Sequence, residues 1–229
     1  MNSNASTNSI TGGVTVTVNE AAGQEAIERA KALLAGIPDG VDKAVKAAMS
    51  RTVQKLRSGS NEAIQERYDI SDAGIRSEKN VRVRYSYQNG VQAVVTFSGR
   101  KIPLYRFGGA QPAVPTQDIA EGRKPVMVKG AWTMQYQGVP ASGHQLKGTG
   151  PTQFTDAFVA RMKSGHIGIF ERTGGMTSEG SDAIREIMGS SVAQMVGRQE
   201  VAQKLTEESY QTFETELDKA VYRILTGWR

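Results

Sequence analysis

The pattern of apolar residues near the start of the chain predicts one strand followed by one helix. Valines alternate with threonines over residues 14–18, and a period of two with β-branched residues is typical of a short strand. The apolar residues of segment 20–34 then recur on one helical face. Gly36 is placed to end this helix, because glycine tolerates the left-handed backbone that follows a last turn.

A second helix, residues 41–56, has the clearest helical period in the chain. Pro38 and Asp39 favour its start, because proline fits a first helical turn and aspartate suits the positive end of the helix dipole. Ser58, Gly59 and Ser60 are expected to interrupt it, with a further short turn over residues 62–68. Its outer face is basic and carries Lys43, Lys46, Arg51 and Lys55.

A β-hairpin is predicted for residues 81–97. Two alternating runs flank Asn89-Gly90, and both of these residues tolerate the positive φ angles of a tight hairpin turn. On the first strand Arg82 and Arg84 share one face and the valines share the other. We therefore expect one solvent-exposed face and one apolar face that packs on the core.

The remaining chain alternates between short predicted elements and polar loops. Loops rich in glycine and proline are expected at residues 108–123 and 138–151, and loops of that length are usually functional or disordered. The other expectations are an extended segment at 102–107, strands at 126–128 and 166–170, a short helix or irregular buried segment at 154–162, a helix from Ser181 to about residue 195, and a helix from residue 198 to the end.

Together these elements predict an α+β fold. One small, mainly antiparallel sheet is expected to carry the hairpin and the strands at 126–128 and 166–170, with the long amphipathic helix packed on it and a long C-terminal helix nearby. The expected division is a flexible arm at residues 1–13, an α+β domain at 14–197 and the C-terminal helix at 198–229.

Composition narrows the functional classes only a little. The formal net charge is +5, but charges of both signs are scattered and no run of like charge marks a nucleic-acid tail. There is no cysteine, which excludes disulfides and thiolate metal sites. No apolar run approaches the roughly 18 residues of a membrane span, and the N-terminus does not resemble a signal peptide, so we expect no membrane contact and synthesis in the cytoplasm.

Few residues in the sequence suggest a catalytic, cofactor-binding or metal-binding site. The two histidines, His144 and His166, have no carboxylate cluster at metal-ligand spacing beside them. The phosphate-binding GxxxxGK[ST], the dinucleotide-binding GxGxxG between strand and helix, and the hydrolase GxSxG are all absent from the sequence. We therefore predict no catalytic residue, cofactor or metal site. The alternative is a nucleic-acid-binding protein that uses the basic helix face together with Arg82 and Arg84, and a hydrolase would have to depend on His166.

One stretch is more specific. Residues 158–175 read F-V-A-R-M-K-S-G-H-I-G-I-F-E-R-T-G-G, and after a short loop residues 184–195 read I-R-E-I-M-G-S-S-V-A-Q-M. This stretch resembles the signature of the minor tail protein Z family, the tail completion proteins of long-tailed bacteriophages. The motif residues, which the resemblance implies are structural, are Ser164, Gly165, His166, Gly168, Phe170, Arg172, Ile184, Glu186, Gly189, Ser191, Gln194 and Met195.

The resemblance extends over about residues 20–200. Upstream it includes the basic helix, a Tyr-x-Ile at Tyr68 to Ile70, and the hairpin that leads to Ile102-Pro103-Leu104. Ser190 departs from the pattern, because the family commonly has proline there, which puts the rigidity of that turn in doubt. The N-terminal arm and the 138–151 loop look peculiar to this chain.

The resemblance implies a structural virion protein and not an enzyme. It implies a place in the neck, at the head-proximal end of a long tail, and a homo-oligomeric, hexameric ring that helps to join tail to capsid. Expected partners are copies of the same chain and the tail terminator, tail tube or head-completion proteins, with contact to DNA in the channel left open. A ring needs two different patches on each subunit, and the arm at residues 1–11 and the 138–151 loop are the predicted interface segments.

Overall fold

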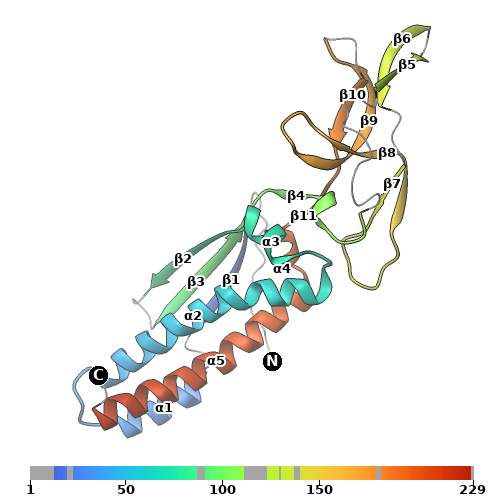
Figure 1. The fold of residues 1–229 in the computed structure, drawn as a ribbon. Helices are drawn as coiled ribbons and strands as arrows, with labels where there is room; N and C mark the ends of the chain where they lie inside the picture. The colour runs from blue at the N-terminus through green and yellow to red at the C-terminus, as the bar shows by residue number, and fades with distance from the viewer. Residues whose placement is uncertain are drawn as a thin grey trace. The chain divides into compact units, whose positions relative to one another are not determined.

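The structure, a computed structural model, describes residues 13–19, 23–86, 91–110, 123–128, 130–136, 140–178 and 182–227. Helices and antiparallel strands make up these residues, which confirms the predicted α+β class (Figure 1). Their contacts divide them into two units. The first unit draws on residues 1–64, 79–100 and 191–229, and the second on residues 65–78 and 101–190.

Some predicted features lie outside the described residues. These are the N-terminal arm as far as residue 12, the start of the first predicted helix at residues 20–22, the Asn89-Gly90 turn, most of the 108–123 loop, the beginning of the 138–151 loop, and the Ser181 cap.

The sheet of the first unit has three antiparallel strands. These are β1 (Gly13–Asn19), β2 (Asn80–Ser86) and β3 (Gln92–Ser98), in the order β1-β3-β2. The predicted hairpin strands pair with Val83 opposite Val95, and β1 pairs with the other edge of β3 with Val16 opposite Val95. Val95 and Phe97 are fully buried, so the apolar face of the sheet forms one side of this unit's core.

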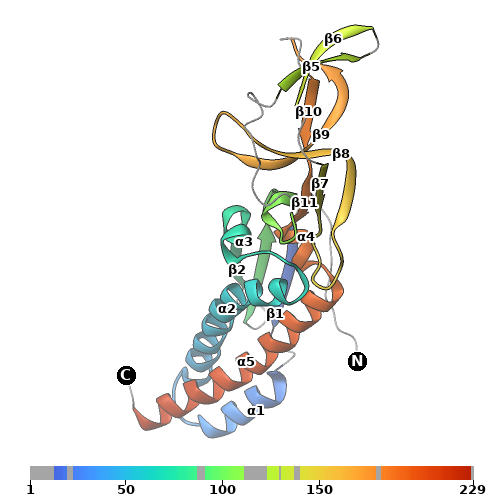
Figure 2. The same cartoon turned by 45° about the vertical axis from the view of Figure 1, so that its right-hand side comes forward.

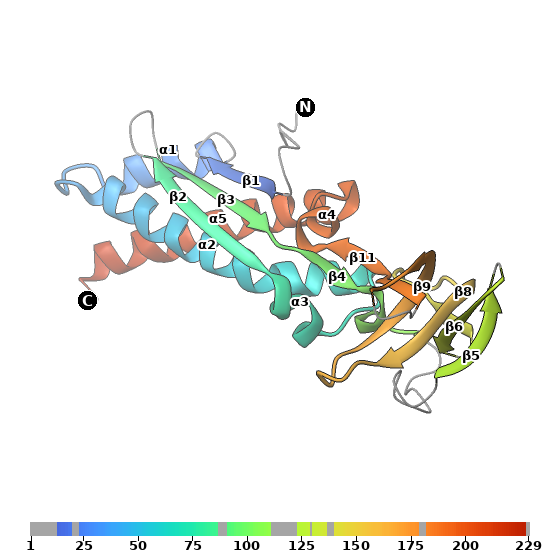
Figure 3. The same cartoon turned by 90° about the horizontal axis from the view of Figure 1, so that it is seen from above.

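Helices cover the apolar face of this sheet, as Figure 3 shows. The long helices α2 (Gly40–Arg67) and α5 (Gln199–Thr226) lie side by side and line one groove together (Figures 1 and 3). The shorter helix α1 (Gln24–Leu33) packs along α5 (Figure 2), and α4 (Val192–Val196) contacts β1 and β3. The predicted C-terminal helix is confirmed, and it ends at Gly227 in the left-handed conformation.

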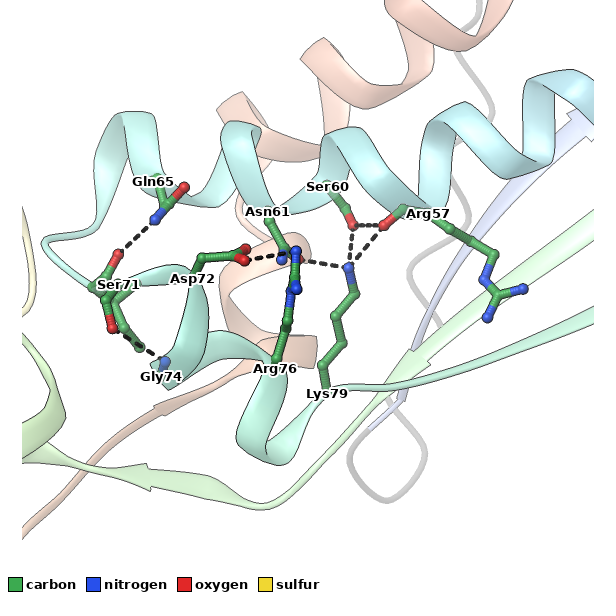
Figure 4. A network of polar contacts seen from close by, with 10 residues as sticks. Arg57, Ser60, Asn61, Gln65, Ser71, Asp72, Gly74, Arg76 and Lys79 are labelled. Atoms are coloured by element: carbon green, nitrogen blue, oxygen red, sulfur yellow. Dashed lines mark hydrogen bonds and ion pairs between the residues drawn. The ribbon is translucent and has the colours of Figure 1, made fainter.

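The prediction that residues 58–60 interrupt the second helix is wrong, because α2 continues to Arg67. Ser58 and Ser60 turn their hydroxyl groups back onto carbonyl oxygens of the preceding turn, so neither competes with the helix. Lys79 adds a tertiary anchor within the first unit: its Nζ donates to the carbonyl oxygen of Arg57 at 2.9 Å, to Ser60 Oγ at 2.7 Å and to Asn61 Oδ1 at 2.6 Å (Figure 4).

The second unit contains most of the strands and one short helix, α3 (Asp72–Glu78). Its largest sheet has four antiparallel strands in the order β10-β9-β8-β7, and two pairs, β11-β4 and β5-β6, complete it. A 3₁₀ turn, η2 (Leu104–Arg106), follows β4. The strands are β4 (Lys101–Pro103), β5 (Arg123–Val128), β6 (Ala131–Tyr136), β7 (Pro140–Gly143), β8 (Thr152–Arg161), β9 (Ile167–Met176), β10 (Asp182–Glu186) and β11 (Met188–Ser191).

The expectation of a single sheet is wrong. The hairpin, the strand at 126–128 and the strand at 166–170 belong to three separate sheets. Local alternation identifies a strand but carries no information about a partner far along the chain. The 138–151 segment is also not a loop throughout, because its residues 140–143 form β7 and pair with β8.

Two predicted helical segments are strands. Residues 154–162 lie almost wholly in β8, and residues 182–191 form β10 and β11. Of the helix predicted from Ser181 to about residue 195, only the part in α4 is helical. Ile184 and Met188 have helical spacing, but β10 is fixed by its pairing with β9, where Ile184 lies opposite Arg172. Tertiary pairing therefore overrides a local helical period here.

Candidate functional site

The motif begins in the tight turn that joins β8 to β9. Met162 donates its backbone N–H to the carbonyl of His166, and Gly165 donates to the carbonyl of Met162, each at 2.8 Å. Gly165 has a φ of +83°, which a residue with a side chain adopts only with strain. Ser164 and Gly165 are exposed at the tip, so their part in the motif is to make this turn.

His166 and Glu186 form a pin between the ends of β9 and β10. His166 Nε2 lies 2.7 Å from Glu186 Oε1, and the two side chains are 38% and 23% exposed. Gly168 makes room for this bond, because a Cβ atom there would lie 2.4 Å from the same carboxylate oxygen. The ring of Phe170 meets the imidazole edge-on at 6.3 Å.

An apolar cluster lies beside this pin. Phe158, Ala160 and Phe170 are buried together, with Met162 and Ile184 packed against them. The guanidinium of Arg172 lies over the ring of Phe158, 4.7 Å from its centroid, as in a cation–π contact. Phe170, Arg172 and Ile184 of the motif thus join three strands of the four-stranded sheet.

Gly189 and Ser190 sit in β11 of the second unit. A Cβ atom on Gly189 would lie 2.5 Å from Phe107 Cε2, so only glycine allows this approach. Ser190 donates both its backbone N–H and its hydroxyl to Gln145 Oε1, at 2.8 and 2.9 Å. A proline at this position could donate neither hydrogen bond. The serine therefore holds this segment through its two bonds to Gln145, where a proline would restrict the backbone.

The last motif residues belong to the first unit. Ser191 is the N-cap of α4, and it forms a capping box with Gln194: the Gln194 N–H donates to Ser191 Oγ, and the Ser191 N–H donates to Gln194 Oε1. Met195 is fully buried one turn into this helix. The motif is therefore divided between the two units, with Ser191, Gln194 and Met195 in one and the other residues in the second.

Sequence reasoning missed a second histidine–carboxylate pair. His144 Nε2 lies 2.9 Å from Asp69 Oδ2, across 75 positions of sequence. Gly108 and Gly109 leave space for it, because Cβ atoms there would lie 2.0 Å from Asp69 Oδ2 and 2.1 Å from His144 Cε1. The only available signal was the Tyr-x-Ile pattern, whose Tyr68 and Ile70 are buried on either side of Asp69.

Both pairs hold segments together. Each imidazole faces a carboxylate through Nε2, and an imidazole nitrogen in that position carries a proton and donates it to the hydrogen bond. Within the described residues, no hydroxyl group is bonded to either ring, as a serine nucleophile would be. The same residues contain no group of three or more His, Cys, Asp or Glu placed to hold a metal ion, and no helix among them is long and apolar enough to cross a membrane.

The two basic features do not form one surface. On β2, Arg82 and Arg84 point to the face of the sheet opposite its buried valines, so they face away from the helices. The basic side chains of α2 are exposed on the far side of the helix layer, because its other face is buried. Nucleic acid would thus meet only one of the two, and binding of DNA stays an untested prediction.

Comparison with protein families matches residues 23–227 to the family described as prophage minor tail protein Z (GPZ). No curated protein and no solved structure matched in the other two comparisons. The family match covers both units, including the pinned β9–β10 strands and the capped α4 helix. The chain therefore belongs to the prophage minor tail protein Z family, and it is a structural protein of the virion tail and not an enzyme.

Proposed function

We propose that this protein is a tail completion protein at the head-proximal end of a long phage tail. There it forms a homo-oligomeric, hexameric ring that helps to join the tail to the capsid. Its neighbours are the tail terminator, the tail tube or the head-completion proteins of the neck. The observation that carries this proposal is the family match over residues 23–227.

The chemistry of the motif supports a load-transmitting joint. His166 and Glu186 tie β9 to β10, while Arg172 and Phe158 tie β9 to β8. Such cross-strand contacts stiffen a sheet without presenting a reactive group. A joint between two assemblies needs stiff subunits, because the contacts with one assembly must stay in a fixed position relative to the contacts with the other.

Two segments remain proposed interface regions, the arm at residues 1–11 and the part of 138–151 that follows β7. In that second segment, residues 147–150 are exposed, whereas Ala141 within β7 is buried. Contacts with neighbours are therefore proposed for the exposed residues beyond β7. Cleavage at these segments that is equal in the free and the assembled protein would count against this assignment.

Phage that lack this gene product provide the functional test. Tails and heads are produced without the protein and are then mixed together, with and without purified wild-type protein. The proposal predicts that intact tails accumulate unjoined and that added protein restores joined, infectious particles. Normal joining in the absence of the protein would exclude the role.

A further inference from the structure

The sheet of the first unit has a second face, which is turned away from the helices. Ala93, Val95 and Phe97 of β3 are fully buried on the helix side, so the residues between them point to the opposite side. Figure 3 shows this side towards the viewer, with no described element of the first unit over it. Two rows of side chains cross its centre, and we call them the outer sheet face: Arg82, Thr96 and Thr15 in one row, and Arg84, Val94 and Thr17 in the next.

The outer sheet face is positively charged and contains no acidic residue. Arg82 and Arg84 are exposed, and neither is bonded to another described residue. The three strands contain no other charged residue, and the nearest acidic residues along the chain are Glu20 after β1 and Glu78 before β2. The first charged residue after β3 is Arg100. The two arginines are about 6.8 Å apart along β2, less than the screening length of roughly 8 Å in physiological salt, so their fields add.

The side chains beside the arginines indicate the kind of partner. Thr15, Thr17 and Thr96 contribute hydroxyl groups, and Thr15 Oγ1 lies 3.5 Å from Thr96 Oγ1 on this side of the sheet. Arginine and hydroxyl groups are donors that proteins commonly direct to the phosphate oxygens of nucleic acids. Val94 is the one apolar residue of the outer sheet face and is half-buried, so a protein partner would find no aromatic or large apolar anchor there.

We propose that the outer sheet face binds the phosphate backbone of double-stranded DNA. The outer sheet face has no aromatic side chain on which an unpaired base could stack, which favours duplex over single-stranded DNA. Binding through phosphates does not depend on base sequence and weakens steeply with salt. Two arginines make a weak contact in one copy, and several copies on one duplex strengthen it. The inference rests on the proposed function in this respect, because a ring around the path of the DNA presents one such face from each copy.

The test measures binding of the full-length protein to a fluorescent duplex of mixed sequence, by anisotropy, from about 50 mM salt upwards. Arg82→Gln/Arg84→Gln should bind at least about tenfold more weakly, and the slope of log affinity against log salt should fall by about 2, because roughly one counterion is released for each phosphate neutralised. Arg82→Lys/Arg84→Lys keeps both charges and should retain most of the affinity.

The matched control is Arg51→Gln/Lys55→Gln, which removes the same charge from the exposed face of α2 and should leave affinity and salt slope nearly unchanged. Should the Arg82→Gln/Arg84→Gln chain fail to fold, Arg84→Gln alone is compared with Lys55→Gln. No DNA binding by the wild-type protein, or an equal loss in the sheet and helix variants, would overturn the proposal.

Polyglutamate serves as a competitor at the same total charge as unlabelled DNA. The proposal predicts that it displaces the labelled duplex poorly. Equal displacement would overturn the proposal, because it would identify an acidic protein surface as the partner. These assays contain no tails, so their failure would leave the joining role standing, and that role is tested separately by the mixing of heads and tails.

Discussion

At the scale of single residues, the pins depend on glycines that give the partner side chains room. Gly168 is buried, and its absent Cβ leaves the space through which Glu186 reaches His166. The sequence singled out Gly168 only through the family signature, because its role is set by Glu186, eighteen positions later. Gly108 and Gly109 act in the same way for Asp69 and His144, and no local pattern marked them.

Gly168→Ala should therefore destabilise the protein by about 1 kcal/mol, since the new methyl group displaces the carboxylate and breaks a partly exposed bond to His166. Denaturant unfolding measures this as a lower midpoint. Gly150→Ala is the matched control, because nothing lies within 4 Å of a Cβ there. Equal midpoints for the two variants would show that the pin contributes nothing.

Lys79 is a second residue whose role depends on distant partners. Lys79→Met keeps the length of the side chain but removes the donor to buried Ser60 and Asn61, so we expect a loss of about 1–3 kcal/mol. Lys43→Met, on the exposed face of α2, should change the unfolding midpoint little. A similar small effect at Lys79 would mean that solvent replaces the three hydrogen bonds.

At the scale of elements, long periodic segments were predictable and their ends and partners were not. The C-terminal helix and the 81–97 hairpin follow from local patterns that the structure confirms. The continuation of α2 through Gly59 could not be foreseen, because it depends on Lys79 and on the packing of α5. For the same reason the local spacing predicts a helix where the structure has β10, since only pairing with β9 decides its conformation.

The continuity of α2 can be tested at Gly59. A Cβ atom there would come no closer than 4.0 Å to Glu208 Oε2, so Gly59→Ala should stabilise the helix by about 0.5–1 kcal/mol. Gly23→Ala should have the opposite sign, because its Cβ would lie 2.6 Å from Phe213 Cε1. A break in the helix at residues 58–60 would instead leave Gly59→Ala neutral or harmful.

Helix α5 should also make the stability depend on acidic pH. The hydrogen bond from Lys219 is the main cause that lowers the pKa of Glu216 below its usual value. A carboxyl whose pKa is lowered by folding adds stability while it is ionised, and this stability disappears as the pH falls through that pKa. Glu216→Gln should therefore flatten the acid side of the stability–pH curve. An unchanged slope in both Glu216→Gln and Lys219→Met would contradict this.

At the scale of the whole molecule, the family signature predicts the function more narrowly than composition and residue patterns do. Composition and the absence of catalytic motifs indicate only a structural or binding protein. The ordered residues from Ser164 to Met195 narrow this class to the minor tail protein Z family. The exposed apolar side chains of the β5–β6 hairpin do not follow from the sequence, because no strand is predicted at β6 and the exposure of Trp132 depends on which strand pairs with β5.

The position of the protein in the particle tests the central claim most directly. Cryo-electron microscopy of purified tails, with the chain labelled at its C-terminus, gives both place and copy number. We predict a single ring of label at the end of the tail that receives the head. Label along the tube or at the host-facing tip, or a single copy at the head-proximal end, would contradict the proposed role.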